Sequence, residues 1–416
     1  MNLAQELKNR GLVEQSSAPI ETILSQPRTV YLGVDPTADS MQAGNLAVIL
    51  LMKRLSRAGN KVILLVGGGT GMIGDPRESG ERQLSDAKVV AKNAKALRAQ
   101  MQQIIGTKVM LVNNADWLLK VKLVDFLRDI GKHFTVNELV KRDIIRRRLE
   151  TQDESISYTE FAYSLLQGYD FMVLNQKYGV DLQVGGSDQW TNILSGVELI
   201  RRKLGKEAFA FTGPIITDST GKKFGKSEGN AVWLDPKKTS PFKFYQFWLT
   251  LPDEGLDRYL KVYTFLPLEE IEQLMERHRA NPGVREAQET LARLVTEIVH
   301  GPAATAQAVA ATEALFGGTP FSKLPREARA VVLAEAPSVS VNASQVEHGF
   351  LLTEALVQGG IASSKSEARR LIEARGISLS GFPIQDPDQK LYRGDFADGH
   401  ALVRRGKQSV LILVLK

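Results

Sequence analysis

Short apolar strands alternate with amphipathic helices in the first half of the chain, and this alternation limits the possible folds more than any other feature. Strands are expected at 28–35 ("RTVYLGVD"), 61–71 ("KVILLVGGGTG"), 108–114 ("KVMLVNN") and 180–190 ("VDLQVGGSDQW"), and helices at 44–58, 85–105 and 192–204. Nearly continuous apolar strands joined by helices are typical of a parallel sheet with helices on both faces. We therefore expect a Rossmann-like, doubly wound α/β domain that binds ligands where its strands end.

The rest of the chain has a different character, and 416 residues are too many for one ordinary core. Residues from about 239 to 335 predict consecutive helices, and short pieces with Pro, Ser and Gly between 317 and 348 indicate a linker. The last 70 or so residues predict a helix–turn–helix–strand unit, which begins with "LLTEALVQGGIASSKSEARR". We thus expect an α-helical domain and a small α+β domain after the first one.

The composition excludes several classes of site and protein. There is no cysteine, which excludes disulfides, thiolate nucleophiles and cysteine-held metal centres. The five histidines, at 133, 278, 300, 348 and 400, are not spaced as metal ligands usually are. No apolar run is long enough to cross a membrane, and the N-terminus has no apolar signal core, so we expect a cytoplasmic protein. The net charge of +6 is compatible with a polyanionic partner.

The segment "GKKFGKSEG" places two lysines between glycines. Lys223 and Lys226 are three residues apart, and Ser227 follows them. Two ammonium groups on a glycine-hinged loop can close on a polyphosphate and stabilise charge that develops at phosphorus. A flexible basic surface turn is the alternative. A P-loop is disfavoured, because Thr220 stands where that motif needs glycine and no strand leads directly into the turn.

Polar, glycine-containing turns follow three of the expected strands. In "DPTADSMQAGN", Asp39 or Ser40 can cap a helix whose first N–H groups bind anions, and Gly44 suggests that something approaches the backbone closely. A helix start that is merely capped is the alternative. "GGGTGMIGDP" could cradle a nucleotide or make tight turns, and in "VGGSDQW" Asp188 is placed to accept hydrogen bonds from a ribose.

Polar residues also share one stripe of the helix expected in "YTEFAYSLLQGYD". Tyr163, Gln167 and Asp170 lie at positions i, i+4 and i+7 of this otherwise apolar stripe. Buried polar groups cost free energy unless they are paired. These side chains could therefore bind a ligand or form a hydrogen-bonded network in the core, and the sequence leaves both open.

Taken together and in this order, the segments resemble class I aminoacyl-tRNA synthetases, and in particular the bacterial tyrosyl-tRNA synthetases. The similarity is carried over nearly the whole chain by "GVDPTADS", "TGMIGDP", "FLRDIGKHFTVN", "LQGYDF", "QVGGSDQWTN", "KFGKSEG" and "KTSPFKFYQFW". The resemblance implies an enzyme that activates tyrosine with ATP and Mg2+ and then transfers it to tRNA(Tyr). It also implies a homodimer, with "FLRDIGKHF" near the interface.

The resemblance assigns the domains and gives a role to each matching residue. The domains are a catalytic domain (1–220), the lysine loop with an α-helical anticodon-side domain (221–335) and a C-terminal RNA-binding domain (345–416). The residues expected to bind tyrosine are Tyr31, Asp75, Asn114, Tyr163, Gln167, Asp170 and Gln189. Those expected to bind ATP are Asp35, Thr37, Gly44, Gly186, Asp188 and Lys226. Those expected to stabilise the transition state are Gln42, Asn45, Arg82, Lys223, Lys226 and Ser227. No metal held by the protein is implied, and no side-chain nucleophile is needed, because the carboxylate of tyrosine attacks the α-phosphate.

The C-terminal domain has a cluster of basic side chains. Those that could meet tRNA phosphates are Lys365, Arg369, Arg370, Arg404, Arg405 and Lys407. A solvated basic face is the alternative.

The chain departs from the family pattern at two places. Gln42 and Asn45 stand where the family usually has the two histidines of a "HIGH"-type tetrapeptide, and the loop 75–82 is one residue shorter than in the commonest family form. A catalytically impaired RNA-binding protein of synthetase descent is the alternative, motivated by Gln42 alone. An enzyme for tryptophan is disfavoured, because Tyr31 and Asp170 suit a phenol.

Overall fold

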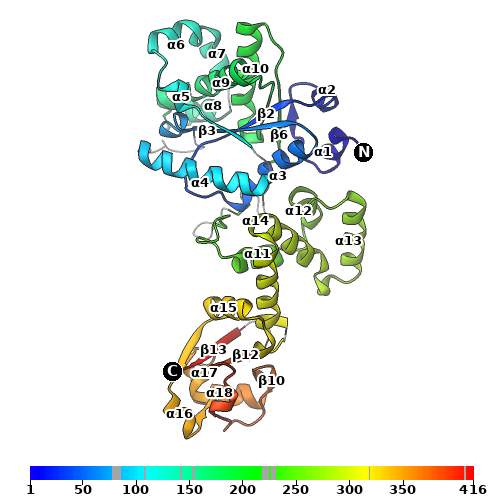
Figure 1. The fold of residues 1–416 in the computed structure, drawn as a ribbon, viewed down its shortest axis with the longest axis vertical. Coiled ribbons are helices and arrows are strands. Elements are labelled where there is room, and N and C mark those ends of the chain that lie inside the picture. Colours follow the sequence, from blue (N-terminus) through cyan, green and yellow to red (C-terminus); the bar gives the residue numbers. More distant parts are fainter. Residues whose placement is uncertain are drawn as a thin grey trace. The chain divides into compact units, whose positions relative to one another are not determined.

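The computed structural model divides the chain into two compact units, Met1–Thr239 with Leu251–Leu291 and Ser240–Thr250 with Ala292–Lys416. Figure 1 traces the chain through both units. The residues described are 1–76, 86–106, 109–140, 143–151, 155–217, 224–225, 231–317, 319–406 and 409–416, without the side chains of 143 and 144.

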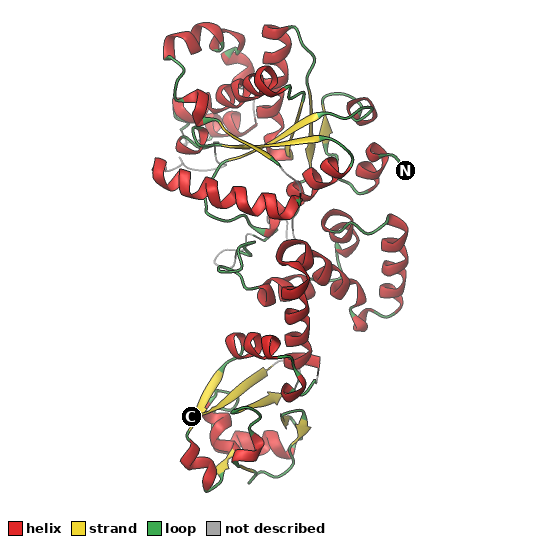
Figure 2. Ribbon diagram, viewed as in Figure 1, coloured by secondary structure: helices red, strands yellow, loops and turns green. Residues whose placement is uncertain are grey.

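A six-stranded sheet forms the centre of the first unit, and helices cover both of its faces (Figure 2). Its order is β1-β6-β5-β2-β3-β4. The strands are β1 (Gln15–Ser16), β2 (Thr29–Val34), β3 (Lys61–Val66), β4 (Met110–Asn113), β5 (Leu182–Gly186) and β6 (Phe209–Gly213). Strands β2 to β6 run parallel, whereas β1 pairs antiparallel with β6. The predicted Rossmann-like, doubly wound sheet is thus confirmed, and its four predicted strands are β2 to β5.

Four long helices place side chains around this sheet. They are α3 (Ala43–Arg57), α4 (Ala87–Ile105), α9 (Tyr158–Tyr178) and α10 (Trp190–Leu204). In Figure 1, α3 and α4 lie on one side of the sheet and α9 and α10 on the other. The ends of α9 show why it begins and ends where it does: the Ser157 side chain accepts from the Glu160 N–H, and Gly179 takes the left-handed conformation that ends many helices.

Shorter helices complete the first unit. They are α1 (Leu3–Asn9), α2 (Ile20–Ile23), α5 (Ala115–Leu118), α6 (Leu123–Asp129), α7 (Val136–Leu139), α8 (Asp143–Glu150), α12 (Leu256–Tyr263) and α13 (Leu268–Ala280). Among all helices in the described parts of the chain, none is both long enough and apolar enough to cross a lipid bilayer.

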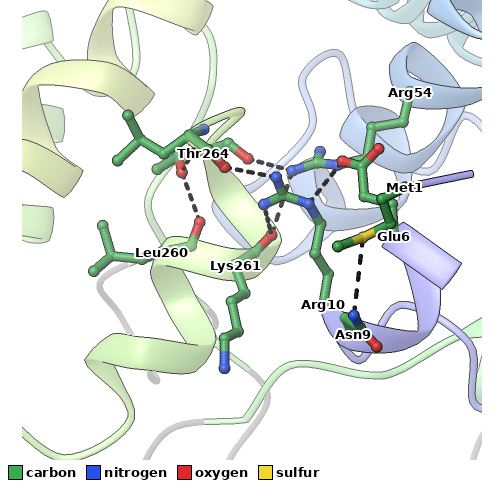
Figure 3. Close-up of polar contacts among 9 residues, drawn as sticks. Met1, Glu6, Asn9, Arg10, Arg54, Leu260, Lys261 and Thr264 are labelled. Atoms are coloured by element: carbon green, nitrogen blue, oxygen red, sulfur yellow. Dashed lines mark hydrogen bonds and ion pairs between the residues drawn. The ribbon is translucent and has the colours of Figure 1, made fainter. Parts of the chain in front are cut away.

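Two buried arginines hold the C-terminal end of α12 (Figure 3). Arg10 follows α1 and donates to the carbonyls of Lys261 (3.1 Å) and Leu266 (2.6 Å). Arg54 lies in α3 and donates to the carbonyls of Thr264 and Lys261. The last carbonyls of a helix have no partner within it, and cations stabilise this end of the helix dipole. The arginines therefore fix α12 against α1 and α3. The first turn of α3 lines the cavity described below.

The second unit contains a five-stranded sheet of order β10-β9-β12-β13-β7 and a two-stranded one. Its strands are β7 (Ser338–Val341), β8 (Phe350–Leu351), β9 (Ile377–Leu379), β10 (Phe382–Pro383), β11 (Lys390–Leu391), β12 (His400–Arg405) and β13 (Ser409–Leu415). Its helices are α11 (Pro241–Leu249), α15 (Arg326–Glu335), α16 (Ala343–Glu347), α17 (Leu352–Gln358) and α18 (Lys365–Glu373), and α14 (Glu286–Thr312) begins in the first unit.

The linker predicted for 317–348 is wrong. This stretch contains α15, β7 and α16, and β7 pairs in parallel with β13. The C-terminal sheet therefore starts before residue 345. The run "SVSV" is short and flanked by Pro and Asn, so its strand character depends on a partner 74 residues later in the chain, as in the pair Ser338 and Ile412. The predicted helix–turn–helix–strand unit is present as α17, α18 and β9.

Candidate active site

A cavity of about 340 Å3 lies at the carboxyl ends of the central strands β2, β3 and β5. This is the place where doubly wound sheets bind their ligands. The predicted site residues that line the cavity are Tyr31, Asp35, Thr37, Gly44, Asn45, Asp75, Tyr163, Gln167, Asp170, Gly186, Asp188 and Gln189. Two others do not line it. Asn114 lies behind the lining residues Thr70 and Asp170, and Gln42 stands just before the lining turn of α3. The remaining four, Arg82, Lys223, Lys226 and Ser227, lie outside the described residues.

A buried carboxylate marks one wall of the cavity. Asp170, on α9, accepts hydrogen bonds from Trp117 Nε1 (2.7 Å) and Asn114 Nδ2 (2.9 Å). Burial raises the pKa of Asp170 to about 7, although both hydrogen bonds act in the opposite direction. The side chain is therefore fixed in place by two donors and can take either protonation state near neutral pH.

Two polar atoms in the same cavity are buried without a hydrogen-bond partner among the described residues. They are the hydroxyl of Tyr31 and Oε1 of Gln183. Tyr31 on β2 is the register partner of Gln183 on β5, so the two side chains project from the same face of the sheet. Burial, and next the charge of Asp170, raise the pKa of Tyr31 well above its ordinary value. Unpaired buried groups cost free energy, which a ligand with a matching polar group would recover.

Asn114 connects this wall to the turn after β3. It is fully buried, and its Oδ1 accepts from the backbone N–H of Gly69 (2.7 Å). Its Nδ2 donates both to Asp170 and to the Thr70 hydroxyl (2.8 Å). A single amide therefore holds a carboxylate of α9 and a backbone turn of the sheet in fixed relative positions.

The same network continues to the next strand. The Thr70 hydroxyl donates to Asp35 Oδ1 (2.8 Å), and the Tyr163 hydroxyl donates to Asp35 Oδ2 (2.9 Å). Residue 67 must be glycine in this arrangement, because a Cβ there would lie 1.9 Å from Asp35 Oδ1. Burial, followed by the charge of Asp35, raises the pKa of Tyr163 well above its ordinary value, which keeps this phenol protonated.

Asp75 is held by amides on the far side of the cavity. Its Oδ2 accepts from Gln189 Nε2 (2.8 Å), and its Oδ1 accepts from Asn192 Nδ2 (3.0 Å). Asp35 and Asp75 thus give the cavity two oriented carboxylates, which suit a cationic group such as an ammonium.

Gln42 and Asn45 stand at the start of α3. The Gln42 N–H donates to Asn45 Oδ1 (3.1 Å), so Asn45 caps the start of its own helix. A Cβ at Gly44 would lie 2.5 Å from the carbonyl oxygen of Phe224. The close approach expected at Gly44 therefore exists, and the chain's own backbone makes it. Gln42 forms an antiparallel bridge with Trp233.

The sequence analysis missed four of the side chains that build the site: Thr70, Trp117, Gln183 and Asn192. Gln183 had a usable signal, because it is a polar residue inside the apolar run "DLQVGG". Thr70 lies in a turn that had already been singled out for its glycines. Trp117 gave no signal, since a tryptophan in a short helix is ordinarily core. Thr70, Trp117 and Asn192 act through partners far away in the sequence.

The basic residues of the second unit have different surroundings. Arg404 is 9% exposed and donates to the carbonyl of Ala314, which counts against its predicted contact with tRNA phosphates. Lys365 and Arg369 are exposed and pair with Glu354 and Asp388. Lys407 lies outside the described residues.

No group of three or more His, Cys, Asp or Glu side chains that could hold a metal ion occurs in the part of the chain that the structure describes.

Residues 25–317 match the family model described as class I tRNA synthetases (W and Y), those for tryptophan and tyrosine. The chain belongs to this family. Residues 327–413 match the model of a tyrosine–tRNA ligase SYY-like C-terminal domain. The resemblance found in the sequence is therefore confirmed, and the match excludes unrelated doubly wound enzymes.

Relatives of known name extend over the full length. The tyrosine–tRNA ligase of Bifidobacterium longum (strain DJO10A) is 46% identical over 421 residues, which cover 98% of this chain and 96% of that protein. That of Streptococcus uberis (strain ATCC BAA-854 / 0140J) is 45% identical and covers 99% and 100%. Among solved structures, a C-terminally truncated mitochondrial tyrosyl-tRNA synthetase of Aspergillus nidulans has a TM-score of 0.65 and 30% identity, over 73% of this chain and 91% of that one.

The substitution Asp170→Asn should change how stability depends on pH. The pKa of about 7 in the folded chain exceeds the ordinary value of 3.8, so the folded state holds this proton more tightly than the unfolded state. The stabilisation is complete below about pH 4 and is lost as the pH rises through about 7. In urea unfolding, we expect the free energy of unfolding of the original chain to fall over this range by a few kcal/mol more than that of Asp170→Asn. Parallel curves for the two proteins would contradict the assignment.

Proposed function

We propose that this chain is a tyrosine–tRNA ligase. It transfers the adenylyl group of ATP to the carboxylate of tyrosine, which forms tyrosyl-adenylate and releases pyrophosphate, and then transfers the tyrosyl group to the 3′-terminal adenosine of tRNA(Tyr). The observation that carries this proposal is the wall of the cavity where the unpaired hydroxyl of Tyr31 and the buried carboxylate of Asp170 lie in one pocket. Full-length relatives that bear this name support it. The cytoplasm is its proposed compartment.

Tyr31 and Asp170 would bind the phenolic hydroxyl of tyrosine. An analogue without that hydroxyl would leave the Tyr31 hydroxyl buried and unpaired and would deprive Asp170 of one hydrogen bond, which costs more than the loss of a methyl-sized contact. Synthetases for tyrosine are themselves the standard illustration of this principle. The same groups do not match an indole, and the C-terminal match is specific to tyrosine–tRNA ligases, so tryptophan is disfavoured as the substrate.

The other residues of the cavity would hold the reacting groups. Asp75, Tyr163 and Gln167 would bind the ammonium of tyrosine, with Asp35 nearby and Asn114 fixing Asp170 from behind. Gln189 would lie near the carboxylate. These side chains come from the carboxyl ends of separate strands and from α9, which lets them surround a small molecule.

The adenylation step needs positioning and charge stabilisation. A carboxylate oxygen of tyrosine forms the new bond to the α-phosphorus, while the bond from that phosphorus to the bridging oxygen breaks and its electrons leave with pyrophosphate. Thr37 and Gly44 would contact ATP, and Gly186 and Asp188 would bind its ribose. The residues proposed to stabilise the transition state are Gln42, Asn45, Arg82, Lys223, Lys226 and Ser227.

Magnesium would enter as the complex with ATP. Mg2+ in nucleotide enzymes is commonly bound by substrate phosphates with one or two carboxylates rather than by a cage of protein ligands. The ion would neutralise phosphate charge, and the protein's part is to hold ATP and tyrosine in line.

The three-domain division remains part of the proposal: a catalytic domain at 1–220, the lysine loop with the anticodon-side helices at 221–335 and an RNA-binding domain at 345–416. The position of β7 suggests an earlier start for the last one. Exposed Lys365, Arg369 and Arg370 would meet tRNA phosphates.

The alternative of an impaired RNA-binding protein rests on Gln42 alone, and nothing in the geometry of the described residues favours it.

Tyrosine-dependent exchange of labelled pyrophosphate into ATP tests the function. The purified chain should catalyse exchange with tyrosine and far less with phenylalanine or tryptophan. Tyr31→Phe removes one partner of the phenol and should lower the preference for tyrosine over phenylalanine about tenfold. No exchange, or stronger exchange with tryptophan, would contradict the proposal, and an inactive protein that Gln42→His activates would support the RNA-binding alternative.

We also propose that two copies form a homodimer through the face around α6. Large apolar side chains are exposed there: Leu119, Leu123, Val124, Leu127 and Val136. Such a concentration of exposed apolar groups commonly marks an interface. The segment includes "FLRDIGKHF", which the sequence analysis placed near the dimer contact.

Val124→Asp should therefore weaken self-association. A carboxylate in an apolar interface would lose its hydration without gaining a partner, so the dissociation constant should rise at least tenfold. Sedimentation velocity over a range of concentrations measures this. Val89→Asp, at a 51% exposed site on α4, is the matched control and should leave association unchanged. A chain that is monomeric before substitution, or equal effects of both variants, would rule out this face.

A further inference from the structure

Two tyrosines of α12 pack against Phe224, which lies between the two lysines of the segment "GKKFGKSEG" (221–229). Phe224 is 3% exposed, and its ring centroid lies 4.9 Å from that of Tyr259 and 5.8 Å from that of Tyr263, at interplanar angles of 35° and 30°. The Tyr259 hydroxyl also donates to the carbonyl of Thr217 (3.3 Å). One helix thus contacts the chain both before the segment and at its centre.

The first turn of α3 holds the same residues from the other side. The carbonyl oxygen of Phe224 would be 2.5 Å from a Cβ at Gly44, and a Cβ at Gly225 would be 3.1 Å from the Cβ of Ala43. Gly225 has φ +72°, which glycine adopts without strain. Phe224 also donates its N–H to the carbonyl of Ile216 (2.9 Å). The dipeptide Phe224–Gly225 is therefore fixed between α3 and α12.

The two helices that hold this dipeptide are also fastened to each other. Arg54, near the C-terminal end of α3, donates to carbonyls at the end of α12, and Arg10 holds the same end (Figure 3). Arg54 is 4% exposed, so these charge-assisted hydrogen bonds are shielded from water. Arg54 therefore sets the position of α12 relative to α3, and the N-terminal end of α3 lines the cavity.

We propose that Phe224, Tyr259 and Tyr263 are positioning residues for adenylate formation, an inference that rests on the function proposed above. Lys223 precedes Phe224 directly and Lys226 follows Gly225 directly, and covalent geometry keeps successive Cα atoms about 3.8 Å apart. A fixed Phe224–Gly225 dipeptide therefore restricts the positions that the Cα atoms of both lysines can take. Their ammonium groups then lose less freedom on reaching the phosphates, which lowers the barrier by orientation. The three aromatic side chains act through the lysines and take no part in the bond changes.

Kinetics of Phe224→Leu and Tyr259→Leu test this inference. Both variants should lower kcat for tyrosine-dependent pyrophosphate exchange roughly ten- to hundredfold, as small misplacements of catalytic groups do. The dissociation constant for tyrosine should stay within about twofold, because the side chains proposed to bind tyrosine come from other elements, although Phe224 lines the same cavity. Tyrosine binding thereby also shows that each variant is folded. Phe244→Leu is the matched control: Phe244 is fully buried and packs on the rings of Trp248 and His300 in the second unit, and its loss should leave kcat unchanged.

A double-mutant cycle separates positioning from a general structural effect. If Phe224 acts through the lysines, Phe224→Leu should lower kcat much less in a Lys226→Ala background than in the original chain. The same fold-loss in both backgrounds, or an unchanged kcat in Phe224→Leu, would overturn the inference. An original chain without exchange would instead refute the proposed function. If Phe224→Leu loses tyrosine binding through misfolding, Tyr259→Leu with Lys226→Ala completes the cycle.

Discussion

The amide of Asn114 is the constraint on which the site depends. It lies fully buried behind the cavity, and both of its polar atoms are engaged: Oδ1 by the Gly69 N–H, and Nδ2 by Thr70 and Asp170. A network of this kind is stable only when every member is satisfied, because each broken bond leaves a polar group in a dry interior. Asn114 therefore decides the position of the turn after β3 and of the central carboxylate together.

The consequence of this network is a pocket formed before any substrate arrives. Thr70 donates a hydrogen bond to one oxygen of Asp35, and Tyr163 on α9 donates to the other, so this carboxylate is fixed as well. What the network leaves unpaired is equally specific, since the Tyr31 hydroxyl and Gln183 Oε1 have no partner among the described residues. Preorganised polar groups lose little free energy to reorganisation when the substrate binds. The start of α3 is built differently: the backbone of Phe224 lies against Gly44, and the Phe224 ring packs on Tyr259 and Tyr263 of α12.

Much of the fold could be predicted because its signals are local. Strands β2 to β5 are continuous apolar runs, and the glycine-rich turns after them predicted the edge of the sheet where the cavity lies. Strand β1 was missed because it has only two residues at the edge of the sheet, whereas β6 was missed although it is as long as β5 and fully buried. The linker between 317 and 348 was wrong because the partner of β7 is at the C-terminus.

In the candidate site, too, the sequence predicted the local features and missed the long-range contacts. Most of its residues could be chosen because they stand in turns or on one helical stripe, and the resemblance to a family assigned them roles. Their connections could not be predicted, since Asn114 and Asp170 are 56 residues apart and Tyr163 and Asp35 are 128 apart. The close neighbour of Gly44 was also hidden, because only the folded chain brings the carbonyl of Phe224 to it.

A crystal structure with L-tyrosine bound would test the central claim most directly. The account predicts the phenolic oxygen within about 3.5 Å of both the Tyr31 hydroxyl and an Asp170 carboxylate oxygen. The bonds of Asn114 to Gly69, Thr70 and Asp170 should be unchanged. A tyrosine ring bound with its hydroxyl toward another wall, or a broken Asn114 network, would contradict a pocket preorganised for tyrosine.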